Sequence, residues 1–515
     1  MKKFASFYSK TINLLWAAAL VSLPVTSFAL FSQATNSPVA PLSGLPVALL
    51  CLVWLLPYLL RRGQIPLEAK PLFVFVWISL IASAGAFFIE IPTFKDATII
   101  RQMLRAGLTL LVGISFYLVA ATLPDKLPSL RQALRWISLG GLVMLLWSLT
   151  QVFVLLSGAQ DYPAWVVAVQ KIFVWDKGFF FRLSHRLSGL TYEPSWFTYQ
   201  MTVLYFPLWL SSSLTRQSLF TLKFRNLILE DALLMLALLE FLFSAPRISL
   251  VSLGTLGVIT ALLAHRKLVE RLVLKWQTWR SQRLSPQPDP GRGTPTSNAF
   301  FRLLISGTLL LAYLGITAGI ASFLYRRDER IQRLLSIKTN WQEAARLAIL
   351  DESAWLRVSL NLYFFERVNY WFFGLHVFQR YPWLGVGLGN AGFFYLEELP
   401  APGWESYETR GLTYSLASLP NVKNLWVRLL AESGLAGFAA FGFWLFVLWR
   451  SARLLQRAND PFYRQIALFG SLSLAALLAE GFSIDSYAFP YFWIVAGLLS
   501  AAAPLYRRGI SELSA

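Results

Sequence analysis

Residues 134–157 read LRWISLGGLVMLLWSLTQVFVLLS, and their only charged residue is Arg135. As an α-helix this segment would be about 36 Å long at about 1.5 Å per residue, enough to cross the roughly 30 Å hydrocarbon core of a bilayer. Comparable apolar runs lie near 11–31, 43–60, 71–90, 104–122, 196–213, 227–244, 248–264, 302–325, 433–449, 465–485 and 487–506. The sequence therefore predicts an all-α polytopic membrane protein with about twelve transmembrane helices.

The composition of the 515 residues excludes three other classes of protein. Hydrophobic residues make up 56% of the chain and charged residues 14%, whereas soluble domains carry about 25% charged residues. Cys51 is the only cysteine, so no disulfide can form within the chain. These numbers exclude an ordinary soluble enzyme, a secreted disulfide scaffold and a disordered chain.

Basic residues set the expected topology. Lys and Arg number 46 against 27 Asp and Glu, a formal net charge of +19. In a multi-span protein this excess collects in cytoplasmic loops, so we expect no nucleic-acid partner. The connection 265–301 is basic and then rich in Pro and Gly, which indicates a flexible cytoplasmic loop. The alternating basic flanks place both termini in the cytoplasm, with an uncleaved first span.

Two long connections are expected on the outer side, about 158–195 and about 326–432. The second mixes helix-like stretches with Trp, Tyr, Gly and Pro, which indicates a folded, partly helical extracytoplasmic loop between spans nine and ten. We therefore expect three regions: spans one to nine in residues 1–325, the large loop in 326–432, and spans ten to twelve with a cytoplasmic tail in 433–515.

Several motifs of catalysis or cofactor binding are missing from the sequence. There is no Gly-x-x-x-x-Gly-Lys-Ser/Thr loop and no His-Glu-x-x-His, and the three histidines are scattered,. Gly385-Val-Gly-Leu-Gly-Asn390 resembles a dinucleotide-binding fingerprint, but it lacks the final glycine and a βαβ frame, and a turn explains it. No pair of aspartates is spaced to hold a divalent metal on the outer face. We expect neither a metal nor a cofactor.

Arginines at the expected outer boundary of the membrane are the candidate binding residues. They are Arg182 and Arg186 before the sixth span, Arg247 between the seventh and eighth, and Arg357 and Arg367 in the large loop. A guanidinium group stays charged, and its fork matches phosphate oxygens. For Arg247 the alternative is snorkelling or a salt bridge to Glu240 or Glu230. Arg182 and Arg357 are also consistent with ordinary surface or paired arginines.

Three other side chains are candidates for proton transfer or for an accessory role. Glu193 precedes Pro194, where it is consistent with a favourable charge at a helix N-terminus. It is equally consistent with orienting the arginines or accepting a proton from a sugar hydroxyl. Asp485, at the outer end of the eleventh span, is a weaker candidate base. His376 lies in a helical, aromatic stretch, where a packed histidine is the commoner case.

Four segments follow one another in an order that resembles a known family. They are Arg186-Leu-Ser-Gly189 with Glu193-Pro-Ser195, Ser244-Ala-Pro-Arg247, Arg367-x-x-x-Trp371 with Tyr381-Pro-Trp-Leu-Gly-Val-Gly387, and Asn424-Leu-Trp-Val-Arg-Leu-Leu-Ala-Glu-Ser-Gly434. With the large loop after the ninth span, they resemble the O-antigen ligase and O-antigen polymerase superfamily of bacterial envelope glycosyltransferases. The resemblance implies a C-type fold in the bacterial cytoplasmic (inner) membrane, with the active site facing the periplasm.

One residue departs from the pattern of that family. Its ligases place a His before the Asn of the last segment, where this chain has Lys423. A buried lysine can act as a base if its amine is neutral, or it can contact phosphate as a cation. The missing His favours polymerisation over ligation.

The resemblance also implies a mechanism and partners. The donor would be a glycan on a polyprenyl diphosphate, with the diphosphate held by Arg186 and Arg247 and assisted by Arg367. An acceptor hydroxyl would attack with inversion and pass its proton to Glu193 or Lys423. The implied partners are this donor, a glycan acceptor, membrane lipid, and the flippase and chain-length regulator of the same pathway.

The activity that we favour is therefore an O-antigen or exopolysaccharide polymerase. An O-antigen ligase, which joins the glycan to lipid A core, is the first alternative. A flippase or transporter for the lipid-linked oligosaccharide is the alternative from another class. Carriers place charges near the bilayer midplane and often break helices there, whereas the arginines of this chain lie at the expected outer boundary, under a large loop. That placement favours a catalyst.

Overall fold

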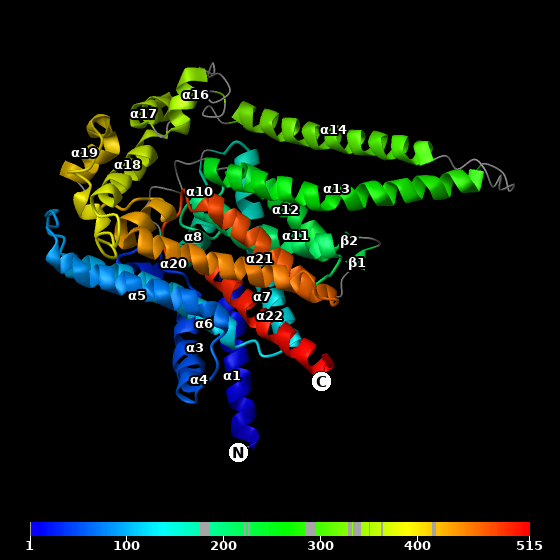
Figure 1. Cartoon of the computed structure of the whole chain (residues 1–515), viewed down its shortest axis with the longest axis horizontal. Coiled ribbons are helices and arrows are strands. Elements are labelled where there is room, and N and C mark those ends of the chain that lie inside the picture. Colours follow the sequence, from blue (N-terminus) through cyan, green and yellow to red (C-terminus); the bar gives the residue numbers. More distant parts are fainter. Residues whose placement is uncertain are drawn as a thin grey trace. The chain divides into compact units, whose positions relative to one another are not determined.

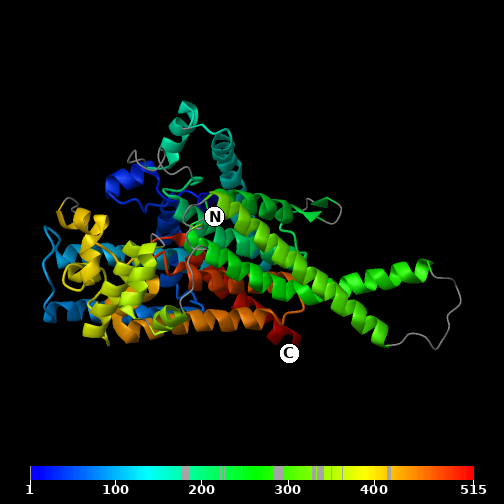
Figure 2. The same cartoon turned by 90° about the horizontal axis from the view of Figure 1, so that it is seen from above.

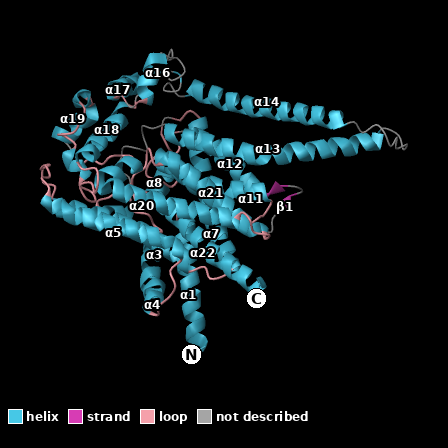
Figure 3. Ribbon diagram, viewed as in Figure 1, coloured by secondary structure: helices cyan, strands magenta, loops and turns pink. Residues whose placement is uncertain are grey.

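Helices form nearly all of the regular structure, as Figure 3 shows. The computed structural model describes residues 2–159, 161–175, 186–220, 223–224, 227–244, 246–283, 295–327, 332, 341–349, 351–361, 364–414 and 419–514. The described residues form two units, Met1–Leu253 with Phe365–Ala515, and Gly254–Phe364. The boundaries that we expected at 325 and 432 are limits of membrane topology, so they stay a prediction.

Figure 1 labels most helices and both strands of the first unit. Its α-helices are α1 (Lys2–Val21), α2 (Ala29–Thr35), α3 (Gly44–Leu50), α4 (Leu56–Leu60), α5 (Lys70–Gly85), α6 (Ile99–Thr122), α7 (Leu127–Leu156), α8 (Ala164–Phe173), α10 (Pro194–Gln200), α11 (Phe206–Thr215), α12 (Leu229–Ser244), α18 (Phe365–Arg380), α19 (Tyr407–Tyr414), α20 (Leu425–Leu455), α21 (Pro461–Glu480) and α22 (Pro490–Ser514). Two π-helical turns are η1 (Cys51–Leu55) and η4 (Met201–Tyr205), and four 3-10 turns are η2 (Leu67–Ala69), η3 (Ala86–Phe88), η5 (Ala391–Phe394) and η6 (Ala401–Glu405). The strands β1 (Lys223–Phe224) and β2 (Leu227–Ile228) pair as a short antiparallel ribbon.

The described residues of the second unit form two long helices and two short ones. α13 (Arg247–Arg283) begins in the first unit and continues into the second, where α14 (Pro295–Arg327), α16 (Trp341–Ala348) and α17 (Glu352–Asn361) follow. His265 of α13 lies 2.8 Å from Ser306 Oγ of α14. The basic part of the connection that we expected to be a loop, 265–283, is helical. Its Pro/Gly-rich part falls on residues 284–294, outside the described residues.

In the part of the chain that the structure describes, seven helices are long and apolar enough to cross a membrane. They are Leu67–Phe88, Ile99–Thr122, Leu127–Leu156, Arg247–Trp279, Phe300–Arg326, Leu425–Leu455 and Pro461–Glu480. The all-α, membrane-embedded character expected from the sequence is thereby confirmed. The count of about twelve spans stays a prediction, because the other expected spans are shorter, interrupted or more polar.

Two of these expected spans are interrupted and one ends early. The apolar helices over Gly44–Leu60 and Pro194–Thr215 each contain a π-helical turn, η1 and η4. Such turns insert one residue into a helix and occur frequently at functional sites. The first helix ends at Val21 and not near 31, so the predicted end of that span was wrong. Pro24 explains the early end, since helices usually end before the residue that precedes a proline.

Close helix packing builds the core of the first unit. α22 packs on α6, and α20 packs on α5 and α21 (Figures 1 and 2). A Cβ atom at Gly497 would lie 2.6 Å from the carbonyl oxygen of Tyr117, so glycine lets α22 approach the backbone of α6,. The fully buried Trp444 fills the space between α20 and its neighbours, with its ring centroid 5.5 Å from Tyr117 and 5.3 Å from Trp493.

The second half of the expected large loop belongs to the first unit and has a core of its own. Aromatic residues of α18 pack there against the segment that follows, with Tyr395 5.3 Å from Tyr370 and 5.0 Å from Phe373 between ring centroids. Phe94, from the connection between α5 and α6, joins the same cluster. This half of the loop is folded and partly helical.

The glycine-rich segment 385–389 attaches this half of the loop to the bundle. Gly385, Gly387 and Gly389 have φ values of 67°, 83° and 78°, which favour glycine because a Cβ atom is disfavoured there. Val386 N donates to Ala431 O at 3.0 Å, and Gly387 N donates to Glu432 O at 2.9 Å. The segment is a turn that packs on α20, and the structure gives it no βαβ frame.

α20 changes direction where this turn meets it. Gly434 has φ 62° and ψ −168°, so the helix is broken at this residue. The amide groups just after the break donate to the loop: Leu435 N bonds Pro382 O at 2.8 Å and Ala436 N bonds Trp383 O at 3.2 Å. Carbonyl oxygens of the loop therefore accept hydrogen bonds from the amide groups that lose their partners within α20 at the break.

Replacing Gly434 with alanine should destabilise the protein by about 3 kcal/mol, from backbone strain plus overlap. The new Cβ atom would overlap the backbone carbonyl of Trp383. Gly442→Ala is the matched control, since Gly442 lies in the same helix with no atom within 4 Å of its ideal Cβ position. We expect the melting temperature in detergent to fall by roughly 5–10 °C for the first variant and not to fall for the second. Equal melting temperatures would contradict this packing.

Candidate active site

The segment that carries Arg186 is fixed against the turn that carries Arg247. Arg186 Nε and one terminal nitrogen donate to the carbonyl oxygen of Ser244 at 2.8 and 2.6 Å. Leu187 N donates to Phe243 O at 3.2 Å, and Ser244 Oγ donates to Pro194 O at 3.1 Å. Arg247 is three residues beyond Ser244 and begins α13. The structure thus brings together two segments that are about sixty residues apart in the sequence.

Two buried glutamines hold the turn that follows Arg186. Gly189 adopts φ 58°, and its amide donates to Gln151 Oε1 of α7 at 2.9 Å. Its carbonyl oxygen accepts from Gln151 Nε2 at 2.9 Å and from Gln170 Nε2 of α8 at 2.7 Å. The sequence analysis missed both glutamines, although Gln151 is the only amide side chain of the apolar run 134–157 and Gln170 the only one of α8. Buried amides of this kind are expected to have a hydrogen-bonding task.

Glu193 stands at the N-cap position of α10 without capping the helix through its side chain. Its carboxylate accepts the hydroxyl of Ser195. The carboxylate is half-buried, and its own segment is the one that Ser244 binds through Pro194. Glu193 is therefore placed a few residues from Arg186, on the segment that lies against the Arg247 turn.

A buried carboxylate that the sequence analysis missed lies next to the first turns of α13. Glu480, the last residue of α21, is 1% exposed and accepts from Thr202 Oγ1 at 2.8 Å. Thr202 is part of the π-helical turn η4. Ser249, two residues after Arg247, lies beside the Glu480 carboxyl group and 2.8 Å from Thr198. The signal in the sequence was an acidic residue inside the apolar run 465–485.

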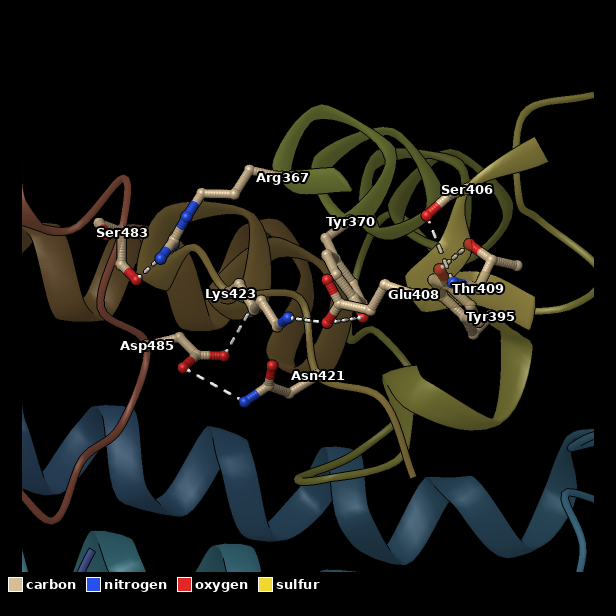
Figure 4. A network of polar contacts seen from close by, with 10 residues as sticks. All are labelled: Arg367, Tyr370, Tyr395, Ser406, Glu408, Thr409, Asn421, Lys423, Ser483 and Asp485. Atoms are coloured by element: carbon tan, nitrogen blue, oxygen red, sulfur yellow. Dashed lines mark hydrogen bonds and ion pairs between the residues drawn. The ribbon is translucent and has the colours of Figure 1, made fainter. Parts of the chain in front are cut away.

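Arg367 joins the same region from the large loop, at the point where α21 has ended. Its Nη1 donates to the carbonyl oxygen of Ser483 at 2.9 Å (Figure 4). Its positive charge also acts on the Glu480 carboxyl group. A continuous chain of contacts therefore runs from the Arg186 segment through the Arg247 turn to Glu480 and Arg367.

Lys423 is part of a network that Figure 4 shows. Its backbone amide donates to Asp485 Oδ2 at 3.1 Å, and Asn421 Nδ2 lies 3.4 Å from Asp485 Oδ1. The Lys423 ammonium forms an ion pair with Glu408 of α19 and lies 4.1 Å from the ring centroid of Tyr370. In this arrangement Lys423 acts as a cation that joins the large loop to the start of α20. A role as general base requires the neutral amine.

The tyrosines of the network are neutral hydrogen-bond donors. Tyr370 Oη donates to Glu408 Oε1 at 2.8 Å. Burial, with a smaller contribution from the Glu408 charge, raises the pKa of Tyr370 well above its usual range. Burial also raises the pKa of Tyr395 to about 12. Both phenols therefore remain protonated at neutral pH, so Glu408 receives a hydroxyl from one side and an ammonium from the other.

Removing either partner of the Lys423–Glu408 pair should destabilise the loop only modestly. Both side chains are about one third exposed, so the pair contributes about 0.5–1 kcal/mol. We expect Lys423→Met and Glu408→Gln each to cost that much, and the double variant to cost no more than one of them. Thermal melting of the three variants measures this. Two fully additive costs would show that the two groups do not interact.

The remaining candidate side chains have structural partners or lie elsewhere. Asp485 binds the 421–423 turn as described, and His376 Nδ1 lies 2.9 Å from the carbonyl oxygen of Glu398. Arg357 belongs to the second unit, where it pairs with Glu343 at 3.4 Å. Arg182 lies outside the described residues. Among the residues that are described, no group of three or more His, Cys, Asp or Glu side chains is arranged to hold a metal ion.

The two salt bridges considered for Arg247 do not occur among the described residues. Glu230 oxygens accept from the amide of Leu219 at 2.6 Å and from the hydroxyl of Ser218. Glu240 is fully buried, and neither of its oxygens has a hydrogen-bond partner there. Neither Glu230 nor Glu240 therefore accounts for the position of Arg247.

Comparison with known proteins adds no further assignment. No family model matches the sequence, and no curated protein matches it significantly.

Proposed function

We propose that this protein is a metal-independent, inverting glycosyltransferase of the membrane, which transfers a glycan from a polyprenyl diphosphate to an acceptor sugar. A polymerase that extends an O-antigen or exopolysaccharide is the activity that we favour. We place it in the bacterial cytoplasmic membrane with both termini in the cytoplasm and the site on the outer face. The observation that carries the proposal is the paired hydrogen bond from Arg186 to Ser244 O, which fixes one arginine segment on the turn of the other.

The diphosphate would be the leaving group. The acceptor oxygen forms a bond to the anomeric carbon while the bond from that carbon to the diphosphate oxygen breaks, and the electron pair leaves with the diphosphate. Arg186 and Arg247 would offset the developing charge, because preorganised cations in a water-poor site stabilise such a transition state. Arg367 would assist from the loop. Attack from the face opposite the leaving group inverts the anomeric centre.

Glu193 is the favoured acceptor of the hydroxyl proton. It lies on the Arg186 segment, and the hydroxyl of Ser195 already donates to it. Lys423, which forms an ion pair with Glu408, would anchor the loop. Glu480 would act as a positioning residue, since it links the π-helical turn of the sixth expected span to the first turns of α13.

The purified protein, given only a labelled polyprenyl-diphosphate glycan, tests this activity. A polymerase yields a ladder of longer lipid-linked glycans. Product that forms only after a lipid A core acceptor is added would indicate the ligase alternative. If the purified protein moves the lipid-linked donor across vesicles, leaves donor in the outer leaflet unconsumed, and loses that transport in an Arg247→Ala variant, the protein is a flippase and the proposal is wrong.

A further inference from the structure

A second candidate site lies near the C-terminal end of α22, the helix that follows Asp485. A cavity of about 1320 Å³ is bounded by α1, α7 and α22, by the end of α6, and by the segment that includes α4 and η2. From Pro490, where α22 begins, to Arg507 in the cavity wall the helix rises by roughly 25 Å at about 1.5 Å per residue,. That length is close to the roughly 30 Å hydrocarbon thickness of a bilayer. Since residues 487–506 are an expected span, we expect the cavity to lie at the level of the opposite membrane surface.

The walls of this cavity are mainly apolar and aromatic. Trp16, Trp54, Tyr58 and Trp136 line it, and the rings of Trp54 and Tyr58 stack with their centroids 5.5 Å apart. Tryptophan and tyrosine are enriched at the membrane–water interface, where an apolar ring meets a polar edge. Such walls are suited to the upper part of an acyl chain.

The polar groups of the cavity include indole donors and two arginines, beside the carboxylate of Asp125 and the amides of Asn13, Gln64 and Gln132. The indole N–H groups of Trp16 and Trp54 are buried without a hydrogen-bond partner in the described residues, and a buried donor of this kind is costly unless it finds an acceptor. Arg507 and Arg508 line the cavity, and Arg507 is fixed by Glu68 at 2.7 Å. The carboxylate in the lining, Asp125, forms an ion pair with Lys126 at 3.9 Å.

We propose that this cavity binds one anionic phospholipid of the leaflet opposite the arginine site. The two arginines would hold the phosphate, the indole N–H groups would donate to headgroup or ester oxygens, and the chains would lie along the aromatic walls. Basic pockets between helices at the cytoplasmic surface recognise anionic headgroups in this way. The site is separate from the proposed glycosyl transfer and does not depend on it.

Native mass spectrometry of the protein released from micelles that contain equal amounts of phosphatidylglycerol and phosphatidylcholine tests this site. Wild type should retain one phosphatidylglycerol with a preference of about fivefold or more over phosphatidylcholine, the effect expected of one arginine at the headgroup. Arg508→Gln and Trp54→Phe should each lower that preference. Arg457→Gln is the matched control, since Arg457 is exposed just after α20 and is not part of the cavity wall.

The comparison of the two lipids uses the wild-type protein alone, so a folding defect in a variant cannot cause the preference that is measured. A melting temperature for each variant confirms that the helices are intact. Equal retention of the two lipids by wild type would overturn the proposal. So would an unchanged preference in both Arg508→Gln and Trp54→Phe, or an equal loss in Arg457→Gln, because each would place the lipid elsewhere on the surface.

Discussion

Arg247→Ala should lower the turnover of the lipid-linked donor by on the order of 100-fold or more, the usual cost of one preorganised donor at a developing negative charge. Arg247 is the first residue of α13 and lies next to the segment that binds Arg186. Neither Glu230 nor Glu240 binds Arg247 within the described residues. The loss should fall mainly on kcat, because the diphosphate carries more charge in the transition state than in the ground state. Quantifying product from labelled donor with purified variants measures it.

Arg216→Ala is the matched control for this prediction. Arg216 forms an ion pair with Asp231 at 3.0 Å, near the start of α12, whereas Ser244 and the Arg247 turn lie at its end. Both substitutions remove one guanidinium group. We expect Arg216→Ala to change turnover less than about threefold, as is usual for an exposed pair. Comparable losses in both variants would mean that net charge and not position is responsible.

Glu193→Gln should lower kcat by about 100- to 10,000-fold if this carboxylate accepts the proton of the attacking hydroxyl. The amide keeps the size of the side chain and an oxygen that accepts the Ser195 hydroxyl, so the segment from Arg186 to Pro194 should keep its conformation. The amide cannot accept a proton at neutral pH. Turnover at saturating donor and acceptor, with KM determined separately, measures the effect.

Lys423→Gln separates the two candidate bases. Because Lys423 is paired with Glu408 as a cation, its loss should lower turnover by about tenfold or less, through the loop, since an exposed pair contributes up to about 1 kcal/mol. Ser195→Ala tests whether the hydroxyl only orients Glu193, and we expect a similarly small effect. A large loss in Lys423→Gln with normal turnover in Glu193→Gln would reverse the assignment.

The class of fold could be predicted from the sequence because every apolar residue of a long run adds to the hydropathy that marks a membrane span. In the part of the chain that the structure describes, seven of these runs are helices long and apolar enough to cross a membrane, and about half of the expected limits lie within three residues of a helix end. The interruptions were not predictable in the same way. The π-helical turn η4 falls within an apolar run, where hydropathy carries no information on backbone hydrogen bonding.

Residues of the candidate site could be predicted only where their position relative to the expected membrane boundary is unusual. Arg247 stands out because the excess of Lys and Arg in cytoplasmic loops does not explain a cation at the expected outer end of a hairpin. Gln151, Gln170 and Glu480 gave weaker signals, since each is a polar residue within a mainly apolar helix that contains other polar residues. Their partners are distant: Thr202 and Glu480 are 278 positions apart. Such pairs depend on helix packing, which the sequence alone does not determine.

Binding of a polyprenyl diphosphate without its glycan, in a double-mutant cycle over Arg186→Lys and Arg247→Lys, tests most directly whether the two guanidinium groups share one ligand. We predict that wild type prefers the diphosphate to the monophosphate by about tenfold or more, equivalent to about 1.4 kcal/mol. The two substitutions should be non-additive, with a coupling energy of about 1 kcal/mol or more, as for side chains that contact the same group. Equal affinity for the two lipids together with additive losses would contradict a common diphosphate site.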